Sequence, residues 1–163
     1  AACVRCQTVK TSALHHSGAM PNTENHLIER LPNGVQKRFL ARCEPFELRL
    51  SAELSERGTP LTHAYFPNTG FISLVVDVDS YPPLEVGVVG RESMLGSELL
   101  LGVVTSPWRS LVQVAGSCWR IDAQGMRQAM ADMPTLQALL QRNLMVRVHQ
   151  HQSLASVSAS HRH

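Results

Sequence analysis

Glycine and proline turns divide the middle of this chain into short apolar segments, and this punctuation constrains the fold more than any other feature of the sequence. The segments alternate apolar with polar residues, or are rich in β-branched and aromatic residues, as strands are. We expect strands at residues 46–50, 64–66, 71–78, 84–89, 111–114 and 118–121, the last two flanking a turn at Gly116. Short strands separated by turns about every eight to twelve residues indicate a small barrel or a double-sheet roll.

Helices are expected on both sides of these strands. Between residues 25 and 40, apolar residues recur at helical spacing around the turn Pro32-Asn33-Gly34, which predicts two short helices. After the strands, Asp122 is a good N-cap for a helix that ends near Ala131. Met126 and Met130 are four residues apart in this helix, and we expect both to pack in the core.

A last helix is expected from Pro134 to about Ser160, because proline suits the first turn of a helix. With a rise of about 1.5 Å per residue it would be about 40 Å long, too long for one small roll to cover. Along one side of this helix, residues at a/d-like spacing form a seam: Leu140, Leu144, Val148, His151, Ala155 and Ser158. We expect this seam to meet a second copy in a homodimer; the alternative is a helix packed on its own roll.

Composition places the chain among ordinary globular proteins with one main domain, since 44% of its 163 residues are apolar and 17% are charged. Residues 1–21 lack periodicity and are expected to form a flexible leader, with Met20 as the natural start. No apolar run approaches the roughly 20 residues that span a bilayer, and we find no signal peptide. We therefore expect a cytoplasmic protein that does not contact membranes.

The formal charge of +2 is too small to predict a nucleic-acid surface. No carboxylate follows Asp132, whereas Arg142, Arg147 and Arg162 do. We expect these cations on a solvated face of the last helix, towards its C-terminal end.

The segment from Leu84 to Gly116 says most about function. At both ends of this segment, residues alternate as they do in strands. Its middle is a glycine-bounded polar turn followed by a short apolar run. Such an interruption makes room for a ligand in a barrel sheet. The sequence contains no nucleophile elbow, no phosphate-binding loop with lysine and no HExxH motif. A sensor is therefore predicted rather than an enzyme.

The local motifs, in their order, resemble the sensor domain of the Crp/Fnr family of transcription regulators. The resemblance covers roughly residues 24–161 and rests on Gly58, Tyr65-Phe66-Pro67 closing on Gly70, Glu85-Val86-Gly87, Gly90-Arg91-Glu92, Met94-Leu95-Gly96 and Val112-Gln113-Val114. It implies a jelly roll (double-stranded β-helix) at residues 22–132, in an α+β, mainly β, fold with short N-terminal helices. It also implies a dimerisation helix at residues 133–163 that ends near the hinge to a helix-turn-helix domain. DNA contact is expected only through that domain, which this sequence does not include.

The resemblance also implies a ligand site in the loop that binds the phosphate of cyclic nucleotides in the family. There, a glycine is followed at once by a glutamate, and an Arg-Ser or Arg-Thr pair comes later. Here Gly96 is followed by Ser97, Glu98 comes one place late, and Ser106-Pro107 stands where the arginine pair would be. Proline supplies neither charge nor N–H, so we favour a different small effector, or none, over a cyclic nucleotide.

Eleven residues are candidates for ligand contact on this basis: Arg91, Glu92, Gly96, Ser97, Glu98, Ser106, Pro107, Arg109, Ser110, His151 and Gln152. Arg109 could supply the missing charge from two residues further along the strand, if no bulge intervenes. His151 and Gln152 lie where the long helix of this architecture approaches a ligand. The alternative for Arg91, Glu92 and Arg109 is a set of surface ion pairs, and polar seam residues also set the register of paired helices.

Four cysteines, Cys3, Cys6, Cys43 and Cys118, are expected to be free thiols in a chain without a secretory signal. An iron-sulfur sensor of the same family would use an N-terminal cysteine cluster and one later cysteine. The third cysteine of that cluster is absent here, and Cys118 is displaced by one residue. We therefore expect no metal or cofactor, and keep the iron-sulfur sensor and a ligand-independent scaffold of the same fold as alternatives.

Overall fold

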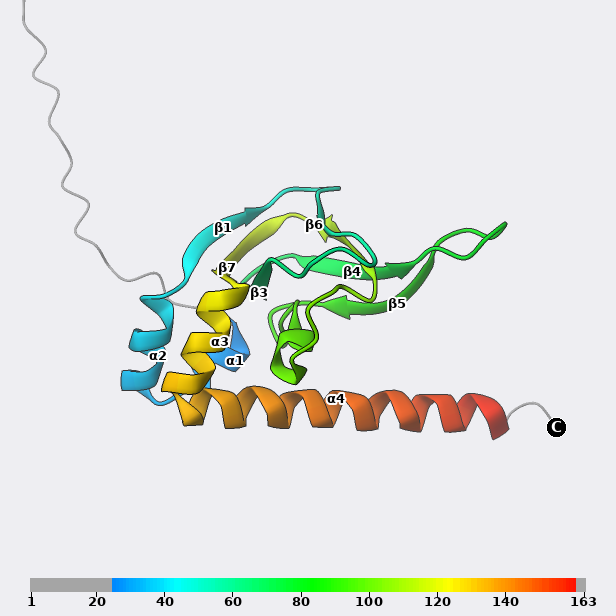
Figure 1. The fold of residues 1–163 in the computed structure, drawn as a ribbon. Helices are drawn as coiled ribbons and strands as arrows, with labels where there is room; N and C mark the ends of the chain where they lie inside the picture. The colour runs from blue at the N-terminus through cyan, green and yellow to red at the C-terminus, as the bar shows by residue number, and fades with distance from the viewer. Residues whose placement is uncertain (1–24, 161–163) are drawn as a thin grey trace, which may run out of the picture.

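Two antiparallel sheets face each other in the computed structural model, which describes residues 25–160, with side chains as far as residue 147 (Figure 1). The first sheet has the order β1 (Glu44–Leu48), β7 (Gly116–Asp122), β3 (His63–Pro67). The second has the order β2 (Glu53–Ser55), β6 (Arg109–Val114), β4 (Phe71–Val76), β5 (Leu84–Val89). Most neighbours in each sheet are distant in sequence, as in a jelly roll, and the predicted fold class is confirmed.

The strands differ from the prediction mainly at their ends. The alternation that began at Phe46 stops at Leu48, because Leu50 is 65% exposed and Ser51 has a left-handed backbone with φ of 65°. The short strand β2 was not predicted; it pairs with β6 across a register shift. Gly116 begins β7 instead of forming a turn, and its backbone lies so close to Thr69 that a side chain would collide with the Thr69 carbonyl.

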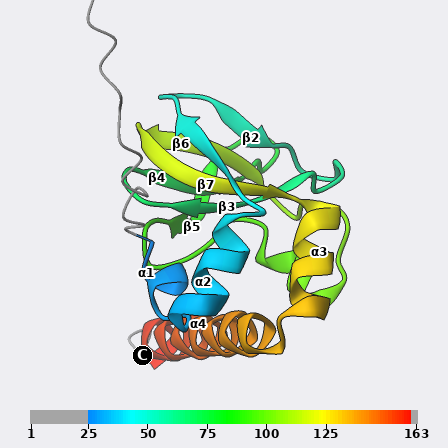
Figure 2. The ribbon, with the colours of Figure 1, turned by 90° about the vertical axis from the view of Figure 1, so that its left-hand side faces the viewer.

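The helices gather on one side of the sheets (Figure 2). They are α1 (His26–Glu29), α2 (Asn33–Leu40), α3 (Ala123–Asp132) and α4 (Pro134–Ser160). Two short helices before the strands, a helix capped by Asp122 and a long helix that begins at Pro134 were all predicted, and all are confirmed. The predicted leader, residues 1–21, lies outside the described residues.

A buried amide connects the first helix to the roll. Asn25 is fully buried, and its Oδ1 accepts hydrogen bonds from the N–H groups of Leu27 (3.1 Å) and Ile28 (3.4 Å), which caps α1. Its Nδ2 donates to the carbonyls of Pro67 (2.8 Å) and Ser93 (3.1 Å). One side chain therefore fixes α1, the end of β3 and the loop after β5 relative to one another.

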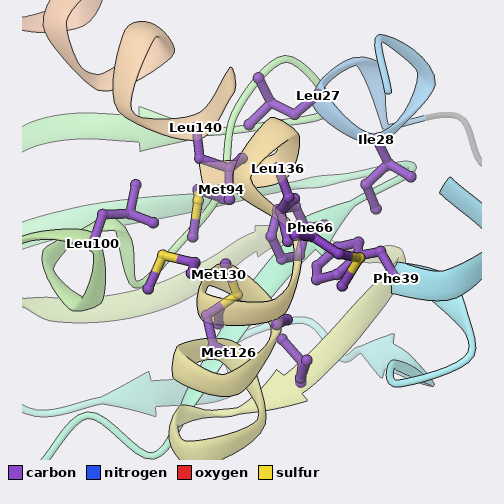
Figure 3. Close-up of a cluster of buried hydrophobic side chains, with 14 of the residues drawn as sticks. Leu27, Ile28, Phe39, Phe66, Met94, Leu100, Met126, Met130, Leu136 and Leu140 are labelled. Atoms are coloured by element: carbon purple, nitrogen blue, oxygen red, sulfur yellow. The ribbon is translucent and has the colours of Figure 1, made fainter. Parts of the chain in front are cut away.

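One apolar cluster joins the helices to the roll (Figure 3). Phe39 of α2 and Phe66 of β3 are fully buried and meet edge to face, with ring centroids 5.4 Å apart. Met126 and Met130 of α3 belong to this cluster, so their predicted core position is confirmed. Close packing of residues from so many elements makes the cluster one rigid unit.

The first half of α4 also belongs to this cluster. Leu140 is only 2% exposed, and Leu144 packs against the cluster from its edge. The expectation that Leu140 faces a partner helix is therefore wrong, because its own chain already buries it. Leu144 is only half-buried, so its place in a seam stays a prediction. Beyond them, the helix continues below β5 and ends about level with the tip of the β4–β5 hairpin (Figure 1).

Replacing Phe66 by alanine is expected to lower the free energy of unfolding by about 3 to 5 kcal/mol, because it leaves a cavity in the shared cluster. Phe71, whose residue is 37% exposed, provides the matched control: Phe71→Ala is expected to cost about 1 kcal/mol or less. Urea unfolding of the 163-residue chain measures both. Equal losses for the two variants would show that the cluster around Phe66 is not the stability centre of the fold.

Candidate ligand site

A cavity of about 300 Å³ lies between the second sheet, the loop after β5 and α4. This volume is at the lower end of the range of about 300 to 1,000 Å³ found for small-molecule sites. Its walls are mainly apolar: they consist of Leu74, Val86, Gly87, Val89, Met94, Leu95, Gly96, Ser97, Glu98, Leu101, Pro107, Trp108, Leu144 and Arg147. The segment Leu84–Gly116, singled out in the sequence, contributes most of them.

The loop that forms one wall contains a short 3₁₀-helix, η1 (Ser97–Leu101), with a left-handed glycine at each end. Gly96 has φ of 90°, and a Cβ at this position would lie 3.0 Å from the carbonyl oxygen of His63. A glycine is therefore required here for two reasons, the backbone conformation and the close approach of the loop to β3. The loop is further held by paired backbone hydrogen bonds between Tyr65 and Leu95.

The cavity has one negatively and one positively charged wall residue. Glu98 comes from η1, and Arg147 comes from α4, where its Nη2 lies 3.5 Å from the carbonyl oxygen of Val88. Burial lowers the pKa of Arg147 below its usual value, and the nearby Glu98 carboxylate opposes that shift. A partly buried guanidinium of this kind favours an anionic or hydrogen-bond-accepting group on a ligand.

Of the predicted ligand residues, Gly96, Ser97, Glu98 and Pro107 line the cavity. The two serines predicted nearby are engaged elsewhere. Ser106 is 3% exposed and donates to the carbonyl of Trp108 at 2.7 Å. Ser110 is fully buried and accepts a 2.7 Å hydrogen bond from the hydroxyl of Ser55. Both therefore hold the strand connections together inside the fold.

Arg109 points away from this cavity. Its Nε and Nη2 donate to the two carboxylate oxygens of Asp77 at 3.1 and 2.8 Å. These bonds raise the pKa of Arg109 above its usual value. Arg109 is thus in the surface ion pair that was the alternative interpretation, and it does not line the cavity in place of the missing arginine.

Arg91 and Glu92 line a second, larger groove on the other side of Arg147. Glu92 lies beside His26 there, with 3.6 Å between the imidazole Nδ1 and the carboxylate Oε1. His151 and Gln152 belong to α4, but their side chains lie outside the described residues, so their contact with a ligand stays a prediction.

Sequence reasoning missed Trp108, Leu144 and Arg147, which all line the cavity. Helical spacing could have found Arg147, because it lies three residues after Leu144 and seven after Leu140, on the face of α4 that packs on the roll. The expectation that Arg147 lies on a solvated helix face is therefore wrong.

The thiols of the described residues are poor candidates for metal or redox chemistry. Cys118 is 1% exposed, and burial raises the pKa of both Cys43 and Cys118 to about 12. Residues 25–160 contain no group of three His, Cys, Asp or Glu side chains that could hold a metal ion. Cys3 and Cys6, the other cysteines of the iron-sulfur alternative, lie outside the described residues. Within the same residues, no helix is both long and apolar enough to span a membrane.

Comparison with known proteins rests on structure alone, since no protein-family model and no curated protein matches the sequence. A cyclic nucleotide-binding domain from Methylobacillus flagellatus is similar, with a TM-score of 0.68, 12% identity, and coverage of 85% of this chain and 82% of that one. The sensor domain of the transcriptional regulator DNR from Pseudomonas aeruginosa is similar with a TM-score of 0.61 and 18% identity, and the match covers 78% of this chain and 86% of that one.

The c-di-GMP-responsive global regulator CLP from Xanthomonas campestris gives a TM-score of 0.65 at 19% identity over 77% of this chain. The match spans only 63% of CLP, and likenesses at such low identity show the fold alone. The fold is that of a cyclic nucleotide-binding-like domain, and it resembles the N-terminal sensor domains of Crp/Fnr transcription regulators.

Proposed function

We propose that this chain is the effector-sensing and dimerisation part of a Crp/Fnr-like transcription regulator. The observation that carries the proposal is the composition of the cavity: the loop with η1 forms one wall, and Leu144 and Arg147 of α4 form another. A ligand between these walls would contact both elements at once. Binding would therefore shift the position of α4, and with it the presentation of an attached DNA-binding domain.

The cavity favours a small, largely apolar effector with one anionic or hydrogen-bond-accepting group. Its walls are mostly aliphatic, and Arg147 is the only cation that lines it among the described residues. A cyclic phosphate is disfavoured, because Pro107 replaces the usual charged residue and Arg109 is bound to Asp77. Loss of a charge-assisted hydrogen bond costs about 1.5 to 3 kcal/mol.

A thermal-shift screen on the full chain tests this proposal, with cyclic AMP, cyclic GMP, c-di-GMP and a set of aliphatic and aromatic carboxylates. A carboxylate with an apolar body is expected to raise Tm, by an amount equivalent to about 2.7 kcal/mol at 100 times its Kd. Arg147→Gln should weaken that binding about tenfold or more. The matched control Arg109→Gln should leave it unchanged, since that guanidinium lies on Asp77 outside the cavity.

No response to any compound in the screen would favour the competing function, a ligand-independent scaffold of the same fold. Equal effects of Arg147→Gln and Arg109→Gln would contradict the position of the site.

We propose further that two copies pair through the exposed side of α4. Met145 and Val146 are neighbours on the described part of that helix and are 59% and 51% exposed, so the helix offers adjoining apolar side chains that a second copy could cover. Light scattering at micromolar concentration is expected to give about twice the chain mass of 18.0 kDa. Met145→Glu should shift the mass towards the monomer, whereas Gln128→Glu on α3 should not. A monomer mass for the unaltered chain would rule out the dimer.

A further inference from the structure

The groove on the other side of Arg147 is larger than the proposed effector cavity. It has a volume of about 730 Å³ and lies between α1, α4 and the strands β4 and β5. Four arginines from distant parts of the sequence line it: Arg30 follows α1, Arg91 follows β5, and Arg142 and Arg147 belong to α4. Figures 1 and 2 both place α1 directly above the first part of α4.

The charge of this groove is strongly unbalanced. Glu92 is the only acidic residue that lines it among the described residues; its side chain is 81% exposed and lies beside His26. None of the four arginines forms an ion pair within the part of the chain that the structure describes. By contrast, Arg42, Arg109 and Arg120 each hold a carboxylate at 2.6 to 2.8 Å. Unpaired cations around a hollow concentrate anions from solution.

Exposed apolar side chains form part of the groove. Phe71, Val88 and Val146 all line it, and they are 37%, 43% and 51% exposed. Such side chains could be covered by a flat or apolar group but offer nothing to a free inorganic ion. The combination of four arginines with exposed apolar side chains around one groove therefore favours a molecule that has both an anionic and a ring-like part.

We propose that this groove is a second ligand site, for a small organic polyanion of the nucleoside-phosphate class. The phosphates would lie on the four arginines, where guanidinium groups can donate two parallel hydrogen bonds, and the base would cover Phe71 and Val88. The volume is within the range of small-molecule sites. This site is separate from the effector cavity, although Arg147 borders both.

Isothermal titration calorimetry of the full chain with ATP tests the proposal, with tripolyphosphate and adenosine as the two partial ligands. ATP is expected to bind once per chain, more tightly than either partial ligand, and less tightly as salt is added. Arg30→Gln and Arg142→Gln are each expected to weaken ATP binding about tenfold or more. Both residues are exposed, so unchanged melting temperatures can establish that the variants fold.

Two control variants distinguish binding in this groove from binding in the effector cavity and from a general effect of surface charge. Arg127→Gln removes an exposed arginine of α3 that does not line the groove, and Glu98→Gln alters the effector cavity alone; both should bind ATP like the unaltered chain. A changed ATP affinity with Glu98→Gln but not with Arg30→Gln would place ATP in the cavity and overturn the proposal. An absence of ATP binding at millimolar concentration would also overturn the proposal. This result is expected if a second copy of the chain covers the groove. Equal affinities for ATP and tripolyphosphate would exclude the nucleoside part.

Discussion

The packing of α4 into the apolar cluster between the helices and the roll is the constraint on which the rest of the structure depends. Leu136 and Leu140 of α4 share this cluster with Leu99 and Leu100 of the loop that forms the cavity wall, and with Phe66 of β3. Protein cores are close-packed, so side chains in one cluster cannot move far independently. A displacement of the η1 loop must therefore be accommodated by α4. In the proposed function, the core itself would connect the cavity to this helix.

The polar contacts place α4 where it can respond to that connection. Asn25 fixes α1 and the start of the loop after β5, and Gly96 lets the loop lie directly against β3. The last described side chain of α4, Arg147, borders the cavity on one side and the arginine-lined groove on the other. Two ligands that each attract this guanidinium would influence one another's affinity by the same factor, as thermodynamic linkage requires.

The architecture could be predicted from the sequence because it depends on local signals. Glycine and proline turns delimit the strands, Asp122 and Pro134 mark where the last two helices begin, and Met126 and Met130 show their buried face by spacing alone. The segment around Gly96 was predicted to be a ligand loop, and it does line a cavity; that it binds a ligand stays a prediction. The turn predicted at Gly116 was wrong, because the glycine is required by the close approach of Thr69, a residue distant in sequence.

The individual roles within the site could not be predicted in this way, because they depend on which partner a side chain finds across the fold. Arg109 was a reasonable replacement for a missing arginine, but Asp77, directly after β4, binds it. Ser106 and Ser110 follow the expected pattern of the loop, yet Ser55 and the Trp108 carbonyl engage their hydroxyls. Leu140 fitted a seam for a partner helix, but the roll provides a nearer apolar surface. The cytoplasmic location and the domain boundary at residue 132 stay predictions.

Hydrogen–deuterium exchange of the full chain, with and without a saturating cavity ligand, measures most directly whether the cavity and α4 respond together. If the shared core transmits binding, the backbone amides of residues 94–108 and those of residues 134–147 will both exchange more slowly in the complex. Protection confined to residues 94–108, with the amides of α4 unchanged, would contradict the connection between the two.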